Sequence, residues 1–205
     1  IKNRLPFRRS IYLIMRMSKN KSWRGKQMFC IVTGGSASGK SEYAESLAIS
    51  SDARQRFYIA TMKPWDEEGH RRIQKHRAMR AGKGFETLEI YGRCADLSVV
   101  HKDSAVLLEC LSNLTANVFY DPIYADKDLA QMITEDILDL KKRVKDLIMV
   151  TNEIFSDGIT YDPETTCYMQ ILGQVNQNLA READRVIEVV YGIPVEIKIP
   201  GVKMS

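Results

Sequence analysis

Residues 34–41 have the sequence GGSASGKS, which matches the phosphate-loop pattern G-x-x-x-x-G-K-[ST]. Glycines in such a loop permit backbone angles and close approaches that a side chain would forbid. The loop amides and the start of the following helix then point at an anion. In this chemistry Lys40 carries positive charge to the β- and γ-phosphates, and the hydroxyl of Ser41 is placed to hold Mg²⁺. The segment therefore predicts nucleotide binding rather than a glycine-rich turn without a ligand.

Polar residues follow three apolar segments of the chain. Thr61 comes after YIA, Glu109 after AVLL, and the Thr-Asn-Glu of residues 151–153 after IMV. Ligands of open parallel sheets bind beyond the carboxyl ends of the strands, so we expect these residues beside the phosphate loop. Glu109 is the best candidate for the acid that accompanies Mg²⁺, directly or through water. The other interpretation is that Glu109 only caps a neighbouring helix.

Two of the three histidines lie in the basic segment DEEGHRRIQKHRAMR, residues 66–80. If this segment is helical, His70 and His76 are six residues apart and lie on different faces, so they do not bind one metal together. A neutral imidazole is a nucleophile, and the surrounding cations would attract the phosphates of a nucleotide. These residues alone favour a solvated basic helix over a histidine that does chemistry.

The elements that must position these residues alternate along the chain. We expect strands at MFCIVT, RFYIAT, SAVLLEC, DLIMVTNE and RVIEVVYG, and helices at residues 40–50, 128–145 and 164–183. Short apolar strands separated by helices predict an α/β fold, a three-layer P-loop NTPase-like domain with a mostly parallel central sheet. The sequence YGIPVEIKI predicts a turn at Tyr191 and Gly192 into a last strand, which forms a C-terminal antiparallel hairpin.

The net charge of +4 is unevenly placed. Residues 1–27 contain nine Lys or Arg and no acid, which leaves 21 basic residues against all 26 acidic ones. We expect residues 1–27 to be a basic, disordered extension and residues 28–205 to form a single domain. The mildly acidic body speaks against a nucleic-acid partner. No apolar run approaches the roughly 18 residues of a membrane span, and four widely separated cysteines fit a reduced, cytoplasmic protein.

Several motifs together resemble a known family. VTGGSASGKS, YIATMKPWDEE followed by RRIQKHR, LLECLSNL, VTNEIFSDGI and GQVNQNLAREADRVIEVVYGIPVEIK occur in this order. The same order and spacing are found in the bifunctional adenosylcobinamide kinase/adenosylcobinamide-phosphate guanylyltransferases of cobalamin biosynthesis. The resemblance covers residues 28–198. The phosphate loop is generic, whereas R-I-x-x-H-R combined with V-T-N-E and G-x-x-N-Q-x-x-A is specific.

The resemblance implies a two-step enzyme. Such an enzyme phosphorylates adenosylcobinamide with ATP or GTP, and then transfers GMP from GTP onto adenosylcobinamide phosphate through a guanylylated histidine, which matches His76. It also implies Mg²⁺, a cytoplasmic location and a homo-oligomer, typically a trimer. The nucleotide contacts of the family carry over to Gly34, Gly35, Ser36, Ala37, Ser38, Gly39, Lys40, Ser41, Ile59, Ala60, Thr61, Arg77, Ala78, Met79, Arg80, Glu89 and Glu109.

Two segments depart from the family pattern. Phe85 stands where many relatives have a tryptophan, and the stretch GITYDPETTCYMQILG of residues 158–173 lacks the arginines of an R-x-F-R-D block. Those arginines could contact phosphate or a neighbouring subunit. Two rival functions therefore stay in view: a P-loop kinase of a small alcohol without the guanylyltransferase step, and a nucleotide-binding switch or adaptor that uses the basic extension.

Overall fold

A seven-stranded sheet forms the centre of the computed structural model, which describes residues 26–64, 67–94, 97 and 99–200. The strand order is β3-β2-β4-β5-β1-β6-β7. Nearly all of the expected N-terminal extension lies outside the described residues. The strands are β1 (Met28–Thr33), β2 (Gln55–Ala60), β3 (Glu86–Glu89), β4 (Ser104–Glu109), β5 (Asp146–Val150), β6 (Arg185–Val190) and β7 (Ile193–Lys198).

The sheet is parallel except for its last strand. Neighbouring strands from β3 to β6 pair in parallel, and β7 pairs antiparallel with β6. Parallel pairing requires a crossover between strands, and the helices between them supply it. The predicted α/β architecture, with its C-terminal antiparallel hairpin, is therefore confirmed. The short edge strand β3 was not predicted, because its sequence ETLE has no apolar pattern of its own.

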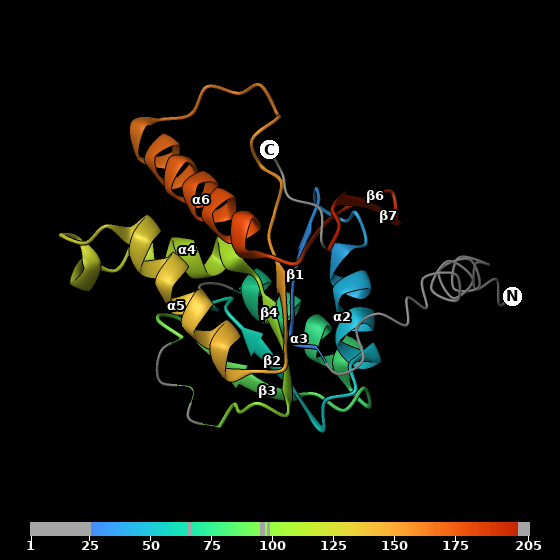
Figure 1. Ribbon diagram of the computed structural model, residues 1–205. Coiled ribbons are helices and arrows are strands. Elements are labelled where there is room, and N and C mark those ends of the chain that lie inside the picture. The colour runs from blue at the N-terminus through green and yellow to red at the C-terminus, as the bar shows by residue number, and fades with distance from the viewer. Residues whose placement is uncertain (1–25, 65–66, 95–96, 98, 201–205) are drawn as a thin grey trace, which may run out of the picture.

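Helices cover both faces of the sheet, as Figure 1 shows, with α4, α5 and α6 on one side and α2 on the other. A first core joins β-strand side chains such as Phe29 and Leu108 to Leu140 of α5 and Leu179 of α6. A second, smaller core packs the opposite sheet face against Ala44 and Ala48 of α2. The helices are α2 (Lys40–Ser50), α3 (Glu67–Arg80), α4 (Leu111–Phe119), α5 (Leu129–Arg143) and α6 (Pro163–Glu182), with a short 3-10 helix η2 (Pro122–Tyr124).

The strand register brings the carboxyl ends of the central strands to one level. Ala60 at the end of β2 is paired with Glu109 at the end of β4, and Glu109 is paired with Val150 at the end of β5. Val150 in turn is paired with Val32 of β1, two residues before the phosphate loop begins at Gly34. The residues that follow these strands therefore meet at one edge of the sheet, as expected for a parallel α/β fold.

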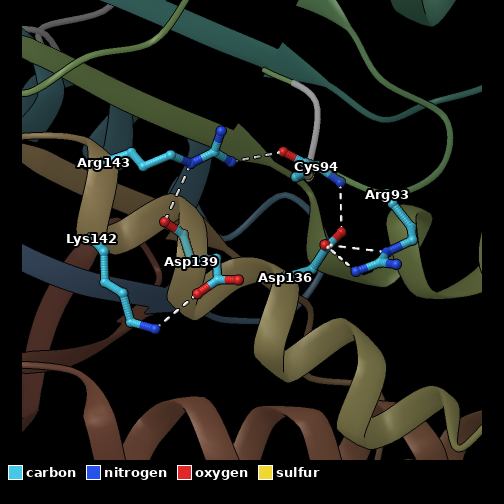
Figure 2. Close-up of polar contacts among 6 residues, drawn as sticks. All are labelled: Arg93, Cys94, Asp136, Asp139, Lys142 and Arg143. Carbon is cyan, nitrogen blue, oxygen red and sulfur yellow. Dashed lines mark hydrogen bonds and ion pairs between the residues drawn. The ribbon is translucent and has the colours of Figure 1, made fainter. Parts of the chain in front are cut away.

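A buried carboxylate fastens α5 to the loop after β3, as Figure 2 shows. Asp136 of α5 is 4% exposed and accepts the backbone N–H of Cys94 at 2.6 Å. Its other oxygen accepts two hydrogen bonds from the guanidinium of Arg93, at 2.9 and 3.2 Å. On the same helix Asp139 is exposed and pairs with Lys142 at 2.8 Å. Both carboxylates thus pair with a basic side chain, but only Asp136 is buried and also accepts a backbone N–H.

Asp136→Ala is expected to destabilise the fold by about 2 kcal/mol, because it leaves the Cys94 N–H buried without an acceptor. Asp139→Ala is the matched control, because its ion pair with Lys142 is exposed to water and contributes little to stability. Urea unfolding followed by circular dichroism measures both free energies. Equal losses in the two variants would contradict the structural role of Asp136.

Within the described residues, no helix is both long enough and apolar enough to cross a membrane.

Candidate functional site

The phosphate loop connects β1 to α2, and its geometry requires glycine. Gly34 has φ 149°, and a Cβ there would lie 2.6 Å from the carbonyl oxygen of Val189. Gly39, directly before α2, has φ 91°, in the left-handed region that other residues rarely adopt. A strand, a glycine loop and a helix N-terminus thus follow one another, which is the arrangement that the sequence motif predicts.

Two neighbouring segments brace this loop through the backbone. Gly192, in the turn between β6 and β7, donates its N–H to the carbonyl of Ser38 at 2.8 Å. Glu153, three residues beyond β5, donates its N–H to the carbonyl of Gly34 at 3.2 Å. The C-terminal hairpin therefore supports the phosphate loop as well as ending the sheet.

Lys40 lies within the curve of the loop. Its Nζ donates to the carbonyl of Gly35 at 2.9 Å, and the residue is 9% exposed. Burial lowers the pKa of the Lys40 ammonium, whereas nearby Cys110 and Glu109 act in the opposite direction. A charged ammonium held against the loop backbone is the arrangement that binds the β- and γ-phosphates of a nucleotide.

Ser41 and Glu109 meet beside the loop. The hydroxyl of Ser41 donates to one carboxylate oxygen of Glu109, and the hydroxyl of Tyr58 donates to the other at 3.0 Å. Hydroxyl and carboxylate oxygens are the hard donors that Mg²⁺ prefers. Within the described residues there is no cluster of three or more His, Cys, Asp or Glu around a metal position. Two protein oxygens fit Mg²⁺ that is shared with nucleotide phosphates, because Mg²⁺ usually keeps few protein ligands.

Tyr58 of β2 is a site residue that the sequence analysis missed. It is 3% exposed, and burial together with the neighbouring Glu109 charge raises the pKa of its phenol. The guanidinium of Arg80 lies 3.5 Å from the centre of the Tyr58 ring. Phe85 meets the same ring edge-on, with centroids 6.3 Å apart. Alternation along RFYIAT places Tyr58 on the α2 face of the sheet, so the sequence held a signal for its orientation but not for its partner.

The histidine-bearing segment is helical, as α3. The side chain of His76 is half-buried and makes no hydrogen bond or ion pair with another described side chain. One residue later, Arg77 forms an ion pair with Glu89 at the end of β3, and Glu89 also accepts from the Tyr91 hydroxyl at 3.0 Å. The Tyr91 hydrogen bond, and after it Arg77, lowers the pKa of Glu89. Arg77 and Glu89, both predicted nucleotide contacts, are thus brought together on the surface.

Other predicted contacts occupy different positions. Thr61 is fully buried, and its hydroxyl donates to the carbonyl of Cys110 at 2.8 Å and accepts from the Cys110 N–H at 2.7 Å. It therefore supports the chain directly after Glu109. Ile59 lies in the core on the face covered by α4, α5 and α6. Their contact with a nucleotide stays a prediction, as does that of Ser36, Ala37, Ala60 and Ala78, and the side chain of Met79 lies outside the described ones.

The two departures from the family pattern lie in different places. Phe85 packs on Tyr58 and so belongs to the site. Residues 158–173 form a loop and the first half of α6, which begins after Asp162 accepts the N–H of Thr165 at 2.9 Å. This stretch, Tyr161 included, lines an open hollow together with Phe155.

Comparison with known proteins places the chain in a family. Residues 30–197 match the family described as cobinamide kinase / cobinamide phosphate guanyltransferase. The bifunctional adenosylcobalamin biosynthesis protein CobU of Escherichia coli is 35% identical over 188 residues, which cover 83% of this chain and all of that protein. The Salmonella typhimurium protein of the same name is also 35% identical, over 83% of this chain and all of its own length. CobP of Pseudomonas aeruginosa is 30% identical, over 82% of this chain and 96% of its own. The phosphate loop, its serine-glutamate pair and the histidine-bearing helix are therefore features of a chain that belongs to the cobinamide kinase / cobinamide phosphate guanyltransferase family.

Proposed function

We propose that this chain phosphorylates adenosylcobinamide with ATP or GTP and then transfers GMP from GTP to adenosylcobinamide phosphate. The product is adenosylcobinamide-GDP. Family membership and the full-length match to bifunctional relatives support both activities. One geometric observation favours a shared site. Arg80, one helical turn after His76, lies on Tyr58, and Tyr58 binds the acid that pairs with Ser41 of the phosphate loop.

In the kinase step the chain positions the triphosphate and offsets its charge. Lys40 contributes its buried ammonium, and the loop amides bind phosphate oxygens. Ser41 and Glu109 would hold Mg²⁺, which neutralises phosphate charge when it is bound. The aminopropanol hydroxyl of the corrinoid forms a bond to the γ-phosphorus, and the bond from that phosphorus to the nucleoside diphosphate breaks. The hydroxyl proton leaves with solvent.

In the guanylyltransferase step His76 is the nucleophile. A ring nitrogen of His76 forms a bond to the α-phosphorus of GTP, and pyrophosphate leaves. An oxygen of the corrinoid phosphate then attacks the same phosphorus, so that the nitrogen-phosphorus bond breaks and His76 is restored. Arg77 and Arg80, one and four residues after this histidine on the same helix, supply positive charge beside it. The GMP transfer thus has two parts, attack by His76 on GTP and attack by the corrinoid phosphate on the GMP held by His76. One nucleotide site can therefore serve both parts.

Three finer assignments belong to the same proposal by resemblance to the family. The metal is Mg²⁺, the enzyme is a cytoplasmic homotrimer, and residues 28–205 form the catalytic domain while residues 1–27 are a dispensable basic extension. An adaptor would lose its partner when residues 1–27 are removed, whereas an enzyme of this family keeps its activity.

The direct test supplies the protein with adenosylcobinamide, ATP, GTP and Mg²⁺ and follows the corrinoid by mass spectrometry. We expect adenosylcobinamide phosphate first and adenosylcobinamide-GDP second. Omitting GTP but keeping ATP should stop the sequence at the phosphate. If adenosylcobinamide phosphate accumulates with GTP present, the chain is a kinase alone and the proposal of two activities is wrong.

A further inference from the structure

The hydroxyl of Tyr58 is directed at the acid of the phosphate-loop site. Tyr58 lies in β2, on the sheet face that α2 covers, and is 3% exposed. It donates to Oε2 of Glu109 at 3.0 Å, while Oε1 of Glu109 accepts from Ser41. Both carboxylate oxygens of Glu109 are therefore hydrogen-bonded, one to Ser41 of the phosphate loop and the other to Tyr58 of β2. A hydrogen bond to a charged acceptor is among the stronger ones in proteins, so this contact fixes the orientation of the carboxylate.

The ring of the same residue carries the end of α3. Arg80, the last residue of α3, is 6% exposed and lies 3.5 Å from the ring centroid. Its Nε and one terminal nitrogen have no hydrogen-bond partner among the described residues, so the ring face is its principal support. Phe85 also packs edge-on against this ring, at an interplanar angle of 79°. A guanidinium held over an aromatic face away from water is bound more strongly than one at an exposed site.

Among the side chains that the structure describes, few other contacts attach α3 to the sheet. Of its 14 residues only Ile73, Ala78 and Met79 are apolar, so the helix has no wide apolar stripe to bury against the sheet. The ion pair between Arg77 and Glu89 is about half-exposed and is worth little in water. Because His76 and Arg80 are four residues apart, they lie on the same face of the helix. The position of His76 therefore depends on where the Arg80 side chain is held.

We infer that Tyr58 is a positioning residue that couples the two halves of the site. Its hydroxyl orients Glu109 beside the phosphate loop, and its ring holds the helix that carries His76. The part of this inference that concerns the ring and α3 rests on the proposed role of His76 as the nucleophile. Tyr58 contacts no reacting atom in either proposed step. It sets the relative position of the nucleophile and of the carboxylate that would hold Mg²⁺.

Two substitutions separate the hydroxyl from the ring. Tyr58→Phe keeps the aromatic face under Arg80 and removes the hydrogen bond to Glu109. We expect the gain in GTP affinity that Mg²⁺ provides to fall by about tenfold, because the carboxylate loses a charge-assisted hydrogen bond. The rate of GMP transfer to His76 at saturating GTP and Mg²⁺ should change by no more than about twofold, since the support of Arg80 is intact. Tyr58→Leu should lower that rate by a further factor of about ten, because it removes the ring as well.

Equilibrium binding of GTP with and without Mg²⁺ measures the first effect, and single-turnover labelling with GTP carrying an α-phosphate label measures the second. Phe57→Leu is the matched control. Phe57 is equally buried on the same strand but faces the other core, away from Glu109 and Arg80. It should lower thermal stability and leave both measurements near the wild-type values.

The outcomes distinguish this inference from the proposed function. If the wild-type chain takes no label, the proposed function fails, and the Mg²⁺ dependence of GTP binding alone decides the role of the Tyr58 hydroxyl. The inference is overturned if Tyr58→Phe binds GTP with the Mg²⁺ dependence of the wild type. It is also overturned if Tyr58→Leu and Phe57→Leu slow labelling equally, since Tyr58 would then be an ordinary core residue.

Discussion

His76→Ala is expected to abolish GMP transfer while leaving the phosphorylation of adenosylcobinamide almost unchanged. Removing a covalent nucleophile typically costs more than about 10³-fold in rate. The kinase step does not use the imidazole, and His76 has no hydrogen-bonded partner among the described residues that its loss would strand. A substitution of this kind away from packed features changes energies by about 0.5 kcal/mol, so the kinase rate should stay within roughly twofold.

The measurement uses GTP labelled at the α-phosphate, with Mg²⁺, followed by denaturation of the protein. We expect acid-labile, alkali-stable label on the wild-type chain, as a phosphoramidate requires, and none on His76→Ala. His70→Ala is the matched control, because His70 lies on the same helix but is exposed and six residues away. It should be labelled like the wild type.

Other results would redirect the interpretation. Label that persists in His76→Ala would place the nucleophile elsewhere. Absence of label in the wild type, with GTP still bound, would reduce the RIQKHR segment to a basic phosphate clamp and favour a kinase or a nucleotide switch. Loss of the kinase reaction together with the label would mean that His76 supports the shared nucleotide site rather than one step.

The sequence predicts the elements with strong local patterns and misses those that depend on tertiary pairing. β1 and α2 are found almost to the residue, because an apolar strand, a glycine loop and a helix follow one another. β3 has only four residues without apolar alternation, and it is a strand because it pairs with β2. The nine-residue helix α4 begins at Leu111, two residues after the end of β4, and the sequence analysis did not predict it.

In the candidate site, too, the sequence predicts some contacts and misses others. The juxtaposition of Ser41 and Glu109 could be predicted, since parallel strands end at one edge of the sheet and the loop lies there. The contact between Arg80 and Tyr58 could not, because it joins residues 22 positions apart through side chains whose types have many possible partners. Tyr58 in particular looks like any core aromatic residue of an apolar strand. Only the fold shows that its hydroxyl reaches a carboxylate.

Lys40→Met should impair both reactions together, in contrast to His76→Ala. The phosphate loop is the nucleotide site proposed for both steps, and Lys40 is its buried ammonium, bonded to Gly35 at 2.9 Å. Removing a preorganised group that stabilises phosphate charge typically costs about 10² to 10³-fold in rate. Lys142→Met makes the same change on the exposed surface of α5 and should leave both rates unaltered. Loss of only one of the two reactions in Lys40→Met would show that the two steps do not share the phosphate loop.

The pH dependence gives a second measurement on the same residue. Burial lowers the pKa of Lys40 from 10.5, so Lys40 in the free enzyme loses its proton at a lower pH than an exposed lysine does. The ammonium is the form that binds phosphate, and kcat/KM reports groups of the free enzyme. We therefore expect kcat/KM for GTP to fall on the alkaline side, beginning below pH 10.5, and Lys40→Arg to move this fall to higher pH because an arginine stays protonated. An unchanged alkaline limb in Lys40→Arg would show that a different group titrates there.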